Sequence, residues 1–239
     1  DPDIPKNEGF FNSVEINAPE GTCVNPRYGK SVAAGTHHPG SEVGEAIAVA
    51  LSQAIPQRAC PQVYKLASPT VIYGEHPRTG AFFVDQGTDT YAGYCSAIKG
   101  QDGWGARNCN SGNLMRSQAE FQESTYPVRF ITRDMIADTG GPGQWRGHPG
   151  SLYVKQLLTD VLVNAWIMGV KHPVPGIAGG WPGSENYLVM RGGSDNAWKV
   201  TSTAFKTPHA DNEAIIYQFG GGGGWGDPLD RDPEAVRED

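Results

Sequence analysis

The sequence predicts a β-rich α+β fold, made mostly of antiparallel strands with few helices. The chain has 32 glycines and 18 prolines among 239 residues, and such a composition indicates many turns and few long helices. Short runs of strand-forming residues alternate with turn residues along most of the chain, whereas a single stretch has clear helical periodicity. The length fits one large domain, so we interpret residues 1–239 as a single β-rich unit.

Charge and hydropathy exclude two classes of partner. The formal net charge is −7, and the chain has no cluster of lysines and arginines of the kind that phosphate backbones require. The longest apolar run, VLVNAWIMGV at residues 161–170, is interrupted by Asn164 and falls short of the ~20 residues of a membrane span. We therefore expect neither nucleic acid nor a membrane as a partner.

The cysteines predict neither a disulfide framework nor a zinc site. Cys23, Cys60, Cys95 and Cys109 form no C-x-x-C pair. We expect four buried, reduced thiols, because free cysteine is usually buried. Reduced thiols in turn favour a cytoplasmic location.

Residues 41–56 have the pattern of an amphipathic helix. Ser41 can cap its first turn, which also contains acidic residues, and Pro56 ends it. One apolar face follows from residues at helical spacing: Val43, Ile47, Ala50, Leu51 and Ala54.

The other predicted elements are strands. Residues 9–18 are rich in strand formers, and residues 126–138 form a long strand that ends at a glycine-rich loop. Residues 70–74 and 81–87 are joined by EHPRTG, which predicts a hairpin. Three further short strands are predicted at residues 186–193, 197–203 and 213–220.

Residues 151–168 allow two interpretations. Their apolar residues fall into two runs divided by Thr159 and Asp160, which favours two strands about a tight turn. A single amphipathic helix is the alternative.

Two glycine-rich loops, residues 134–150 and 218–228, concentrate backbone freedom beside few reactive side chains. A phosphate-binding P-loop needs a lysine after its glycines, and none follows either loop. We expect no nucleotide site in this chain alone. The favoured interpretation is a backbone that packs closely on another backbone or subunit.

The histidines lack the spacing of a metal site. His37 and His38 are adjacent, and adjacent residues of an extended chain point to opposite faces. No H-x-x-x-H or H-E-x-x-H pattern occurs. A structural or substrate-facing role is therefore predicted for both, and no metal ligand is assigned.

Charged residues gather around the first glycine-rich loop. The favoured interpretation is an ion-pair network, and the alternative is that Asp138 and Arg146 frame the rigid wall of a shared site. Arg146 can bind a carboxylate or phosphate through its forked donors, and Asp138 is its expected partner. The network would include Glu120, Glu123, Asp134, Asp138, Arg129, Arg133 and Arg146.

Three long segments carry a resemblance to a known family. They are IPKNEGFFNSVEINAPEGTCVNP, ESTYPVRFITRDMIADTGGPGQWRGHPG and GGGGGWGDPLDRDPEAVRED, in that order. Together they resemble the hydantoinase B/acetone carboxylase alpha family from Asp3 to Asp239. The resemblance implies that the chain is the later part of such a subunit, whose N-terminal portion is absent from this chain.

The resemblance also implies cofactors and partners. Family members work with a larger ATP-using subunit of the hydantoinase A/acetone carboxylase beta type and with a divalent metal, Mn or Zn. The metal ligands lie in the family's N-terminal portion, so ATP and metal are expected to bind outside this chain. The motif positions that carry over are Glu123, Asp138, Gly140, Gly141, Arg146 and residues 220–224.

The implied function is ATP-dependent activation of a carbonyl group in a small molecule. The motifs CPQVYKL and GQDGWG favour carboxylation of a ketone of the acetone or acetophenone type with bicarbonate. The alternatives are hydrolysis of a cyclic amide, such as a hydantoin, a lactam or 5-oxoproline, and a non-catalytic scaffold role. The candidate site-lining residues are Asp138, Arg146, Glu123, His37 and His38.

Overall fold

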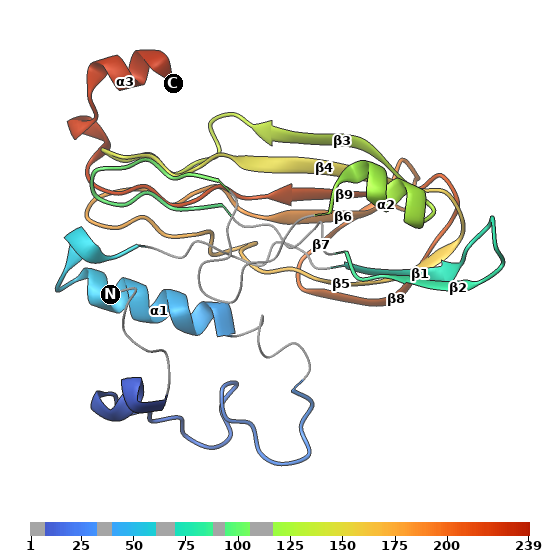
Figure 1. Ribbon diagram of the computed structural model, residues 1–239, viewed down its shortest axis with the longest axis horizontal. Helices are drawn as coiled ribbons and strands as arrows, with labels where there is room; N and C mark the ends of the chain where they lie inside the picture. The colour runs from blue at the N-terminus through green and yellow to red at the C-terminus, as the bar shows by residue number, and fades with distance from the viewer. Residues whose placement is uncertain (1–7, 33–39, 61–69, 88–93, 106–116) are drawn as a thin grey trace.

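The computed structural model describes residues 8–32, 40–60, 70–87, 94–105 and 117–239. Two antiparallel sheets form two packed layers (Figure 1). One sheet has the spatial order β3 (Val128–Ile136), β4 (Gly150–Leu157), β9 (Ala214–Phe219), β6 (Tyr187–Gly192) and β7 (Trp198–Val200). The other has the order β2 (Phe82–Asp85), β1 (Thr70–Glu75), β5 (Val161–Trp166) and β8 (Thr203–His209).

Helices are short and lie outside the two layers. They are α1 (Gly40–Ser52), α2 (Ala119–Thr125) and α3 (Pro233–Glu238), with short 3-10 turns η1 (Glu8–Ser13), η2 (Pro56–Arg58) and η4 (Pro228–Asp230). The predicted fold class, β-rich α+β with few helices, is therefore confirmed. None of the described helices is long and apolar enough to cross a bilayer.

The core lies between the two sheets and follows from strand alternation. In β9, every second residue is buried, including Ile215 and Tyr217, and in β5 the buried positions include Val163. These side chains belong to one hydrophobic cluster with contributions from both sheets. Alternating residues of a strand point to opposite faces, so the pattern read in the sequence places one face of each sheet inside.

The segment 151–168 forms two strands, and the helix alternative is wrong. The strands do not pair with each other: β4 belongs to the five-stranded sheet and β5 to the four-stranded sheet. The turn between them therefore carries the chain from one layer to the other. The hairpin of β1 and β2 and the helix α1 are also confirmed.

Two predicted strands were placed wrongly. Residues 9–18 contain η1 and irregular backbone, because no neighbouring strand pairs with them among the described residues. A bend at residues 201–202 divides the predicted strand 197–203, so that β7 ends and β8 begins there. β8 escaped prediction because it contains Pro208 and a bulge where Lys206 has φ 48° and its N–H bonds Asn164.

The cysteine prediction is only partly right. Cys95 is buried, Cys60 is intermediate, and Cys23 is exposed on a turn-rich segment that packs on no core. Cys109 lies outside the described residues.

Candidate functional site

The glycine-rich loops pack together into one compact unit, which we call the glycine bundle. Its central segment, residues 220–224, runs among residues 95–97, 139–148 and 174–184. Hydrogen bonds leave the central segment toward each of these neighbours, so the bundle is held by backbone groups rather than by a sheet ladder. The bonds are Gly222 N to His148 O (3.0 Å), Gly141 N to Gly222 O (2.8 Å), Ala97 N to Gly223 O (2.9 Å), Gly224 N to Trp181 O (2.9 Å) and Ile177 N to Gly224 O (3.1 Å).

Backbone contacts leave no space for side chains in the bundle. A Cβ at Gly221, Gly222 or Gly224 would lie closer than 3.0 Å to backbone atoms of a neighbouring segment. The backbone that the Cβ would meet differs for each glycine. It belongs to Thr139 for Gly221, to Cys95 for Gly222 and to Pro142 for Gly224. Other backbones therefore surround this segment on several sides, and each of these positions requires glycine. This confirms the interpretation of backbone packed on backbone.

A tryptophan pair closes one end of the bundle. Trp145 and Trp225 exchange backbone hydrogen bonds of 3.0 and 2.9 Å, and their rings lie 5.1 Å apart. The indole Nε1 of Trp225 donates to the carbonyl oxygen of Pro56 at 2.9 Å. This bond connects the bundle to η2 and so to the segment that carries α1.

A cavity of about 460 Å³ lies against the bundle and brings two of the predicted site residues together. Asp138 and Arg146 both line it. Asp138 has φ 57° in the turn that follows β3, a conformation that aspartate tolerates better than most residues. Thr139 fixes this turn, since its hydroxyl donates to Ile136 O at 2.6 Å and accepts from Gly150 N at 2.7 Å.

Arg146 pairs with carboxylates other than Asp138. Its Nη2 lies 2.9 Å from Asp239 Oδ1, and its Nε lies 3.8 Å from Asp102 Oδ2. The backbone N–H of Arg146 donates to Asp102 Oδ1 at 2.9 Å. The expected partnership with Asp138 is wrong, because the loop turns the guanidinium toward residues 102 and 239.

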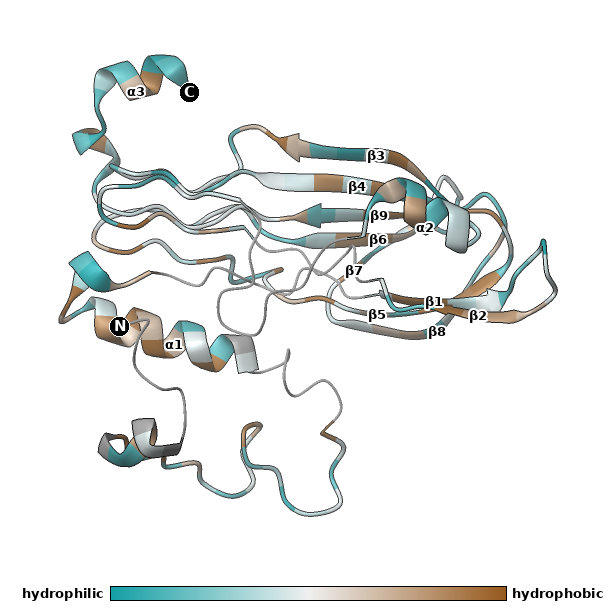
Figure 2. Cartoon of the chain, viewed as in Figure 1, coloured by the Kyte–Doolittle hydropathy of each residue, from teal (hydrophilic) through white to brown (hydrophobic). Residues whose placement is uncertain are grey.

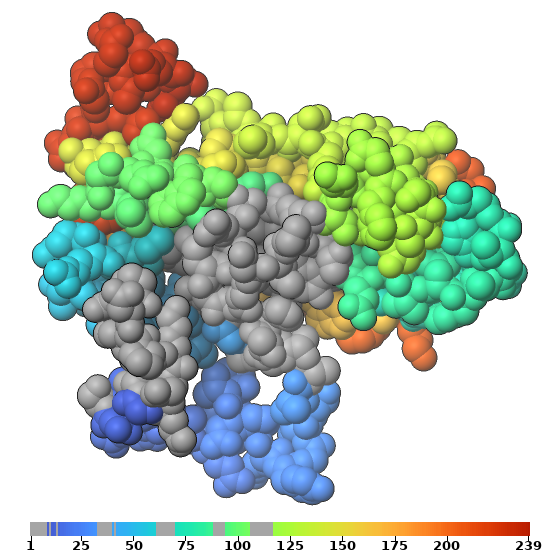
Figure 3. Space-filling model, in the orientation of Figure 1, coloured from blue at the N-terminus to red at the C-terminus, as the bar shows by residue number. Residues whose placement is uncertain are grey.

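Arg231 completes this cluster and fixes the base of the C-terminal helix. Its side chain is only 10% exposed, and it donates to Asp102 at 2.9 and 2.8 Å and to Asp239 at 3.0 and 3.1 Å. Beyond this anchor α3 projects from the body (Figure 3). Burial alone would raise the pKa of Asp102, but the hydrogen bonds and charges of Arg231 and Arg146 hold that pKa below its ordinary value.

The sequence analysis missed this cluster for a simple reason. Asp102, Arg231 and Asp239 lie in unremarkable charged or glycine-rich stretches, and 129 residues separate Asp102 from Arg231. No local spacing rule connects residues so far apart. The available signals were two segments already singled out: GQDGWG contains Asp102, and GGGGGWGDPLDRDPEAVRED contains Arg231 and Asp239.

The other predicted site residues lie elsewhere. Glu123 is on α2, where its Oε1 accepts from Phe130 N at 2.7 Å, close to the start of β3. Asp138 follows the other end of this strand, so about 20 Å of strand, at ~3.3 Å per residue from Phe130 to Ile136, lies between the two carboxylates. His37 and His38 lie outside the described residues.

The predicted ion-pair network around the loop does not form. Among the described residues, no ion pair joins the glutamates and aspartates of the network to its arginines. Arg133 instead donates to Ser117 O at 3.1 Å and lies 5.1 Å from the centre of the Tyr153 ring. Its guanidinium therefore packs on an aromatic face.

A second charged pair is buried between the sheets. Lys155 Nζ lies 3.4 Å from Asp85 Oδ2, and both side chains are almost completely buried. Asp85 Oδ1 also accepts from Gly87 N at 2.7 Å, and the ammonium lies 5.1 Å from the Phe130 ring. Burial and the negative charge of Asp85 together raise the pKa of Tyr126. Sequence reasoning assigned no role to this lysine.

A divalent metal finds no ligand set in the described part of the chain. No three histidine, cysteine, aspartate or glutamate side chains converge there. Such a site normally needs three or four ligands.

Comparison with known proteins identifies the family. The family model described as Hydantoinase B/oxoprolinase matches residues 1–228. The chain belongs to the hydantoinase B/oxoprolinase family. This confirms the resemblance found in the sequence.

Several relatives cover nearly the whole chain. It is 28% identical over 237 residues to the B-type subunit of a putative D-/L-hydantoinase from Pseudomonas sp. (strain NS671), covering 99% of this chain and 39% of that protein. It is 29% identical over 250 residues to the beta subunit of the caprolactamase from Pseudomonas jessenii, covering 98% and 42%. The chain thus spans about two-fifths of the length of these family relatives.

Two solved structures share the fold. The ATP-dependent caprolactamase from Pseudomonas jessenii matches with a TM-score of 0.82 and 26% identity, over 99% of this chain and 42% of that chain. The nucleotide-free acetone carboxylase matches with a TM-score of 0.73 over 94% of this chain and 35% of that chain. The second match, at 19% identity, shows the fold alone.

Proposed function

We propose that this chain is part of the B-type subunit of an ATP-dependent enzyme that opens a cyclic amide. The observation that carries the proposal is its relation, over nearly its full length, to a hydantoinase subunit and a caprolactamase subunit. Hydantoin and caprolactam are both cyclic amides. The structural match to an ATP-dependent caprolactamase supports the same reaction class.

ATP supplies the reactivity that an amide lacks. In the proposed reaction, the amide oxygen attacks the γ-phosphorus of ATP, which releases ADP and leaves a phosphorylated imidate. Water then adds to the imidate carbon and the ring C–N bond breaks, which leaves an acyl phosphate. A second water molecule hydrolyses the acyl phosphate to a carboxylate and inorganic phosphate. The nitrogen takes up a proton, so the products are an open-chain amino acid, ADP and phosphate.

The partners of this chain follow from the same proposal. ATP is held by a separate subunit of the hydantoinase A/acetone carboxylase beta type, and the divalent metal, Mn or Zn, is held by the remainder of the B-type subunit. The described residues do not gather a metal ligand set, so we assign no step through a metal to them. The named relatives are themselves designated as subunits, which supports a multi-subunit enzyme.

Within this enzyme the glycine bundle serves as a rigid wall of the reaction chamber. Arg146 lines the adjacent cavity with a guanidinium that is 39% exposed and held in place by Asp239 and Asp102. A fixed arginine fork suits a carboxylate or a phosphoryl group of the substrate. Asp138 lines the same cavity, and its negative charge limits how much negative charge a ligand in the cavity can carry.

Carboxylation of a ketone is the second candidate. It is supported by the motifs CPQVYKL and GQDGWG and by a fold shared with acetone carboxylase. It ranks second because the more similar relatives with a stated substrate are named for amides.

One assay separates the two reactions. ATP hydrolysis by the assembled complex would be measured with hydantoin, 5-oxoproline and caprolactam, and with acetone and acetophenone, each with and without bicarbonate. Amide hydrolysis predicts stimulation by a cyclic amide that is independent of bicarbonate. Stimulation only by a ketone together with bicarbonate would overturn the proposal and establish the second candidate.

A further inference from the structure

The outer face of the four-stranded sheet is apolar and exposed. Phe82 on β2 and Phe205 on β8 are 72% and 62% exposed. Between them, Val84, Tyr73 and Leu162 form a row paired across three strands. The alternate residues of the same strands fill the core, so this face is the second side of a sheet whose first side is already buried.

Helix α1 also exposes its apolar face. Val43, Ile47 and Leu51, spaced four residues apart, are 41%, 55% and 51% exposed. Among the described elements, η2 is the one with which α1 makes more than marginal contact. The amphipathic pattern read in the sequence is therefore present, but no strand of the body covers it (Figure 2).

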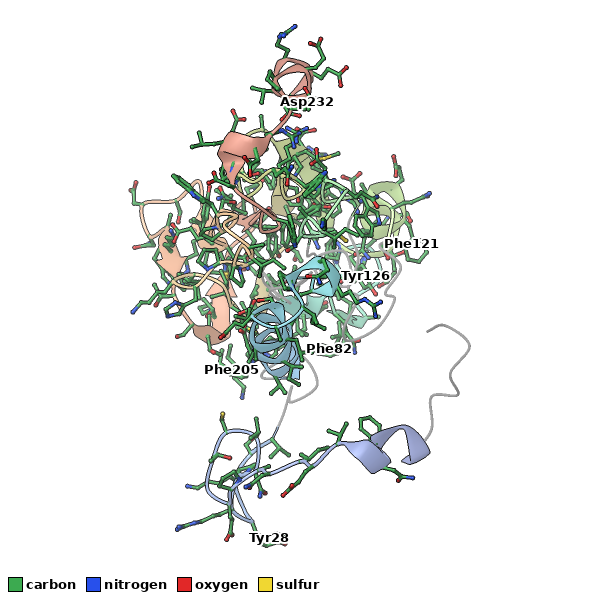
Figure 4. All side chains as sticks on the ribbon, turned by 90° about the vertical axis from the view of Figure 1, so that its left-hand side faces the viewer. Tyr28, Phe82, Phe121, Tyr126, Phe205 and Asp232 are labelled. Carbon is green, nitrogen blue, oxygen red and sulfur yellow. The ribbon has the colours of Figure 1, made fainter. Side chains whose placement is uncertain are left out.

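Both surfaces lie on the same side of the body, which we call the underside. In Figure 1, α1 lies below one end of the body and the strands β1, β2, β5 and β8 form its lower layer at the other end. Figure 4, turned by 90°, places Phe82 and Phe205 at the lower edge as well. Because the two views agree, we treat α1 and the outer face of this sheet as two parts of one side of the body.

Residues 14–32 stand away from the body, below the underside. Their hydrogen bonds to other described residues join positions no more than seven apart. Ile16 and Val32 are 75% and 67% exposed, and Tyr28 lies far from the sheets (Figure 4). An extended segment that buries no apolar surface gains little from the rest of this chain.

A hollow at the end of the underside offers an anchoring pocket. Its volume is about 610 Å³, and Tyr73, Phe82, Leu162 and Pro208 give it an apolar lining. Asp160, Arg191 and Glu213 add charged groups to the lining. Apolar pockets of this kind commonly receive a single large side chain at the centre of a protein interface.

The composition of the underside indicates a permanent interface. Its exposed central residues Phe82, Val84, Leu162 and Phe205 are all apolar, and obligate interfaces are more hydrophobic than transient ones.

We infer that the underside packs against the region of B-type subunits that this chain does not span, here called the companion region, with residues 14–32 wrapped along it. The inference rests on the proposed function, which places both regions in one subunit. The length of the relatives indicates that the companion region covers the underside, because the matched relatives are about two and a half times as long as the part they share with this chain. So large a region requires an extensive, core-like contact, and the underside is the surface of that character.

Hydrogen exchange by mass spectrometry tests the inference on three samples. They are the 239-residue chain alone, the chain with the companion region from the same genome as one polypeptide or two, and the chain with only the ATP-using subunit. We expect the companion region to slow exchange in α1, β1 and residues 14–32 at least tenfold, and exchange in α3 to remain unchanged. Slower exchange caused only by the ATP-using subunit, or increasing with the concentration of the chain alone, would overturn the inference in favour of a heteromeric or a self-association surface.

Matched variants add a second readout. Phe82→Asp combined with Phe205→Asp should weaken assembly with the companion region at least 100-fold, because a charge would be buried in an apolar contact. Phe121→Asp is the control, since Phe121 is 59% exposed on α2 and lies on another side of the body (Figure 4). Equal affinities for the control and the double variant would contradict the inference.

These measurements do not depend on turnover. If the companion region protects the underside but the complete complex hydrolyses no cyclic amide, the proposed function fails and the interface stands. If the complex is active but the underside exchanges freely, the interface fails and the function stands.

Discussion

The sheet core and the glycine bundle hold the same chain together by opposite means. In the core, large side chains such as Tyr217, Leu188 and Ile215 fill the space between two sheets. In the bundle, the backbones themselves are in contact, and residues 220–224 fit because they have no side chains. The core tolerates changes of shape at a moderate cost, whereas the bundle tolerates no added atom at its centre.

The close backbone packing of the bundle predicts that the candidate site is rigid. Side chains can change rotamer, but a backbone with neighbours on several sides cannot move alone. Asp138 and Arg146 lie at the two ends of one loop that backbone hydrogen bonds hold against the central segment, so these bonds set the separation of the two residues. A reaction chamber benefits from such a wall, because fixed polar groups need no reorganisation during the reaction.

The largest effect is expected from a methyl group at the centre of the bundle. Gly222→Ala would force a Cβ against the Cys95 carbonyl, and neither backbone can withdraw without breaking hydrogen bonds. We expect the free energy of unfolding to fall by roughly 5 kcal/mol, which is the range of the most severe single substitutions. Denaturant titration followed by circular dichroism would measure it.

Gly193→Ala provides the matched control. Gly193 has φ 85° and no atoms within 4 Å of a Cβ, so it tests backbone conformation without crowding. The loss there should be about 1–2 kcal/mol. If the two variants were equally stable, close backbone packing would not be the reason for the glycines.

The next largest effect concerns the buried pair in the core. Lys155→Ala leaves the Asp85 carboxylate buried without its ammonium, and we expect a loss of about 3–4 kcal/mol in unfolding free energy. The double variant Lys155→Met with Asp85→Asn removes both charges and keeps an acceptor for Gly87 N. It should recover more than half of the loss. A double variant as unstable as the single one would show that the loss comes from the missing ion pair itself rather than from the unpaired carboxylate.

What the sequence could predict differs between the two regions. The core strands follow from runs of strand-forming residues bounded by turn residues, and β1, β2, β3, β4, β5, β6 and β9 were all found in this way. The bundle has no periodicity, yet the density of glycine was enough to predict backbone packing. What could not be predicted was which segments meet, because the contacts between residues 95–97, 139–148 and 220–224 are distant in sequence.

The candidate site shows the same division. The placement of Asp138 and Arg146 at one cavity followed from the single loop that contains both. The partners of Arg146 did not follow, because Asp102 and Asp239 come from other parts of the chain. Glu123 was grouped with them only through its nearness in sequence, and the length of β3 separates it from the cavity.

A smaller effect, on activity rather than stability, is expected at the edge of the bundle. Arg146→Ala should lower the rate of substrate-stimulated ATP hydrolysis by the assembled complex about 10- to 100-fold, as expected for loss of one charge-assisted contact worth ~1.5–3 kcal/mol. Arg237→Ala is the control, because Arg237 is 72% exposed and pairs only with Glu234 among the described residues. Equal rates for the two variants would favour the scaffold role.

The smallest effect is a dependence of stability on pH at the edge of the sheets. His209 is buried and neutral: Arg191 N donates to its Nε2 at 3.2 Å, and burial lowers its pKa, an effect only partly offset by Thr207 and Glu213. The unfolded chain therefore binds the proton of His209 more tightly than the folded chain does. The contribution of neutral His209 to the free energy of unfolding is present above pH ~6.5 and is lost as the pH falls.

A comparison of unfolding free energies checks the sign. Between pH 7 and pH 5, the wild-type chain should lose stability more steeply than His209→Gln, by at most ~1.4 kcal/mol per pH unit. Parallel slopes would mean that the pKa of His209 is the same in the folded and the unfolded chain.

Native-state hydrogen exchange at the central segment tests the main claim most directly. The amides of Gly222 and Gly224 donate to His148 and Trp181, on two different neighbours. If the bundle is a rigid frame, these amides exchange only when the whole domain unfolds, with the same opening free energy as Ile215 and Tyr217 in the core. Opening free energies lower than those of the core by more than ~2 kcal/mol would show a mobile loop, and the glycine bundle could then not serve as a fixed wall.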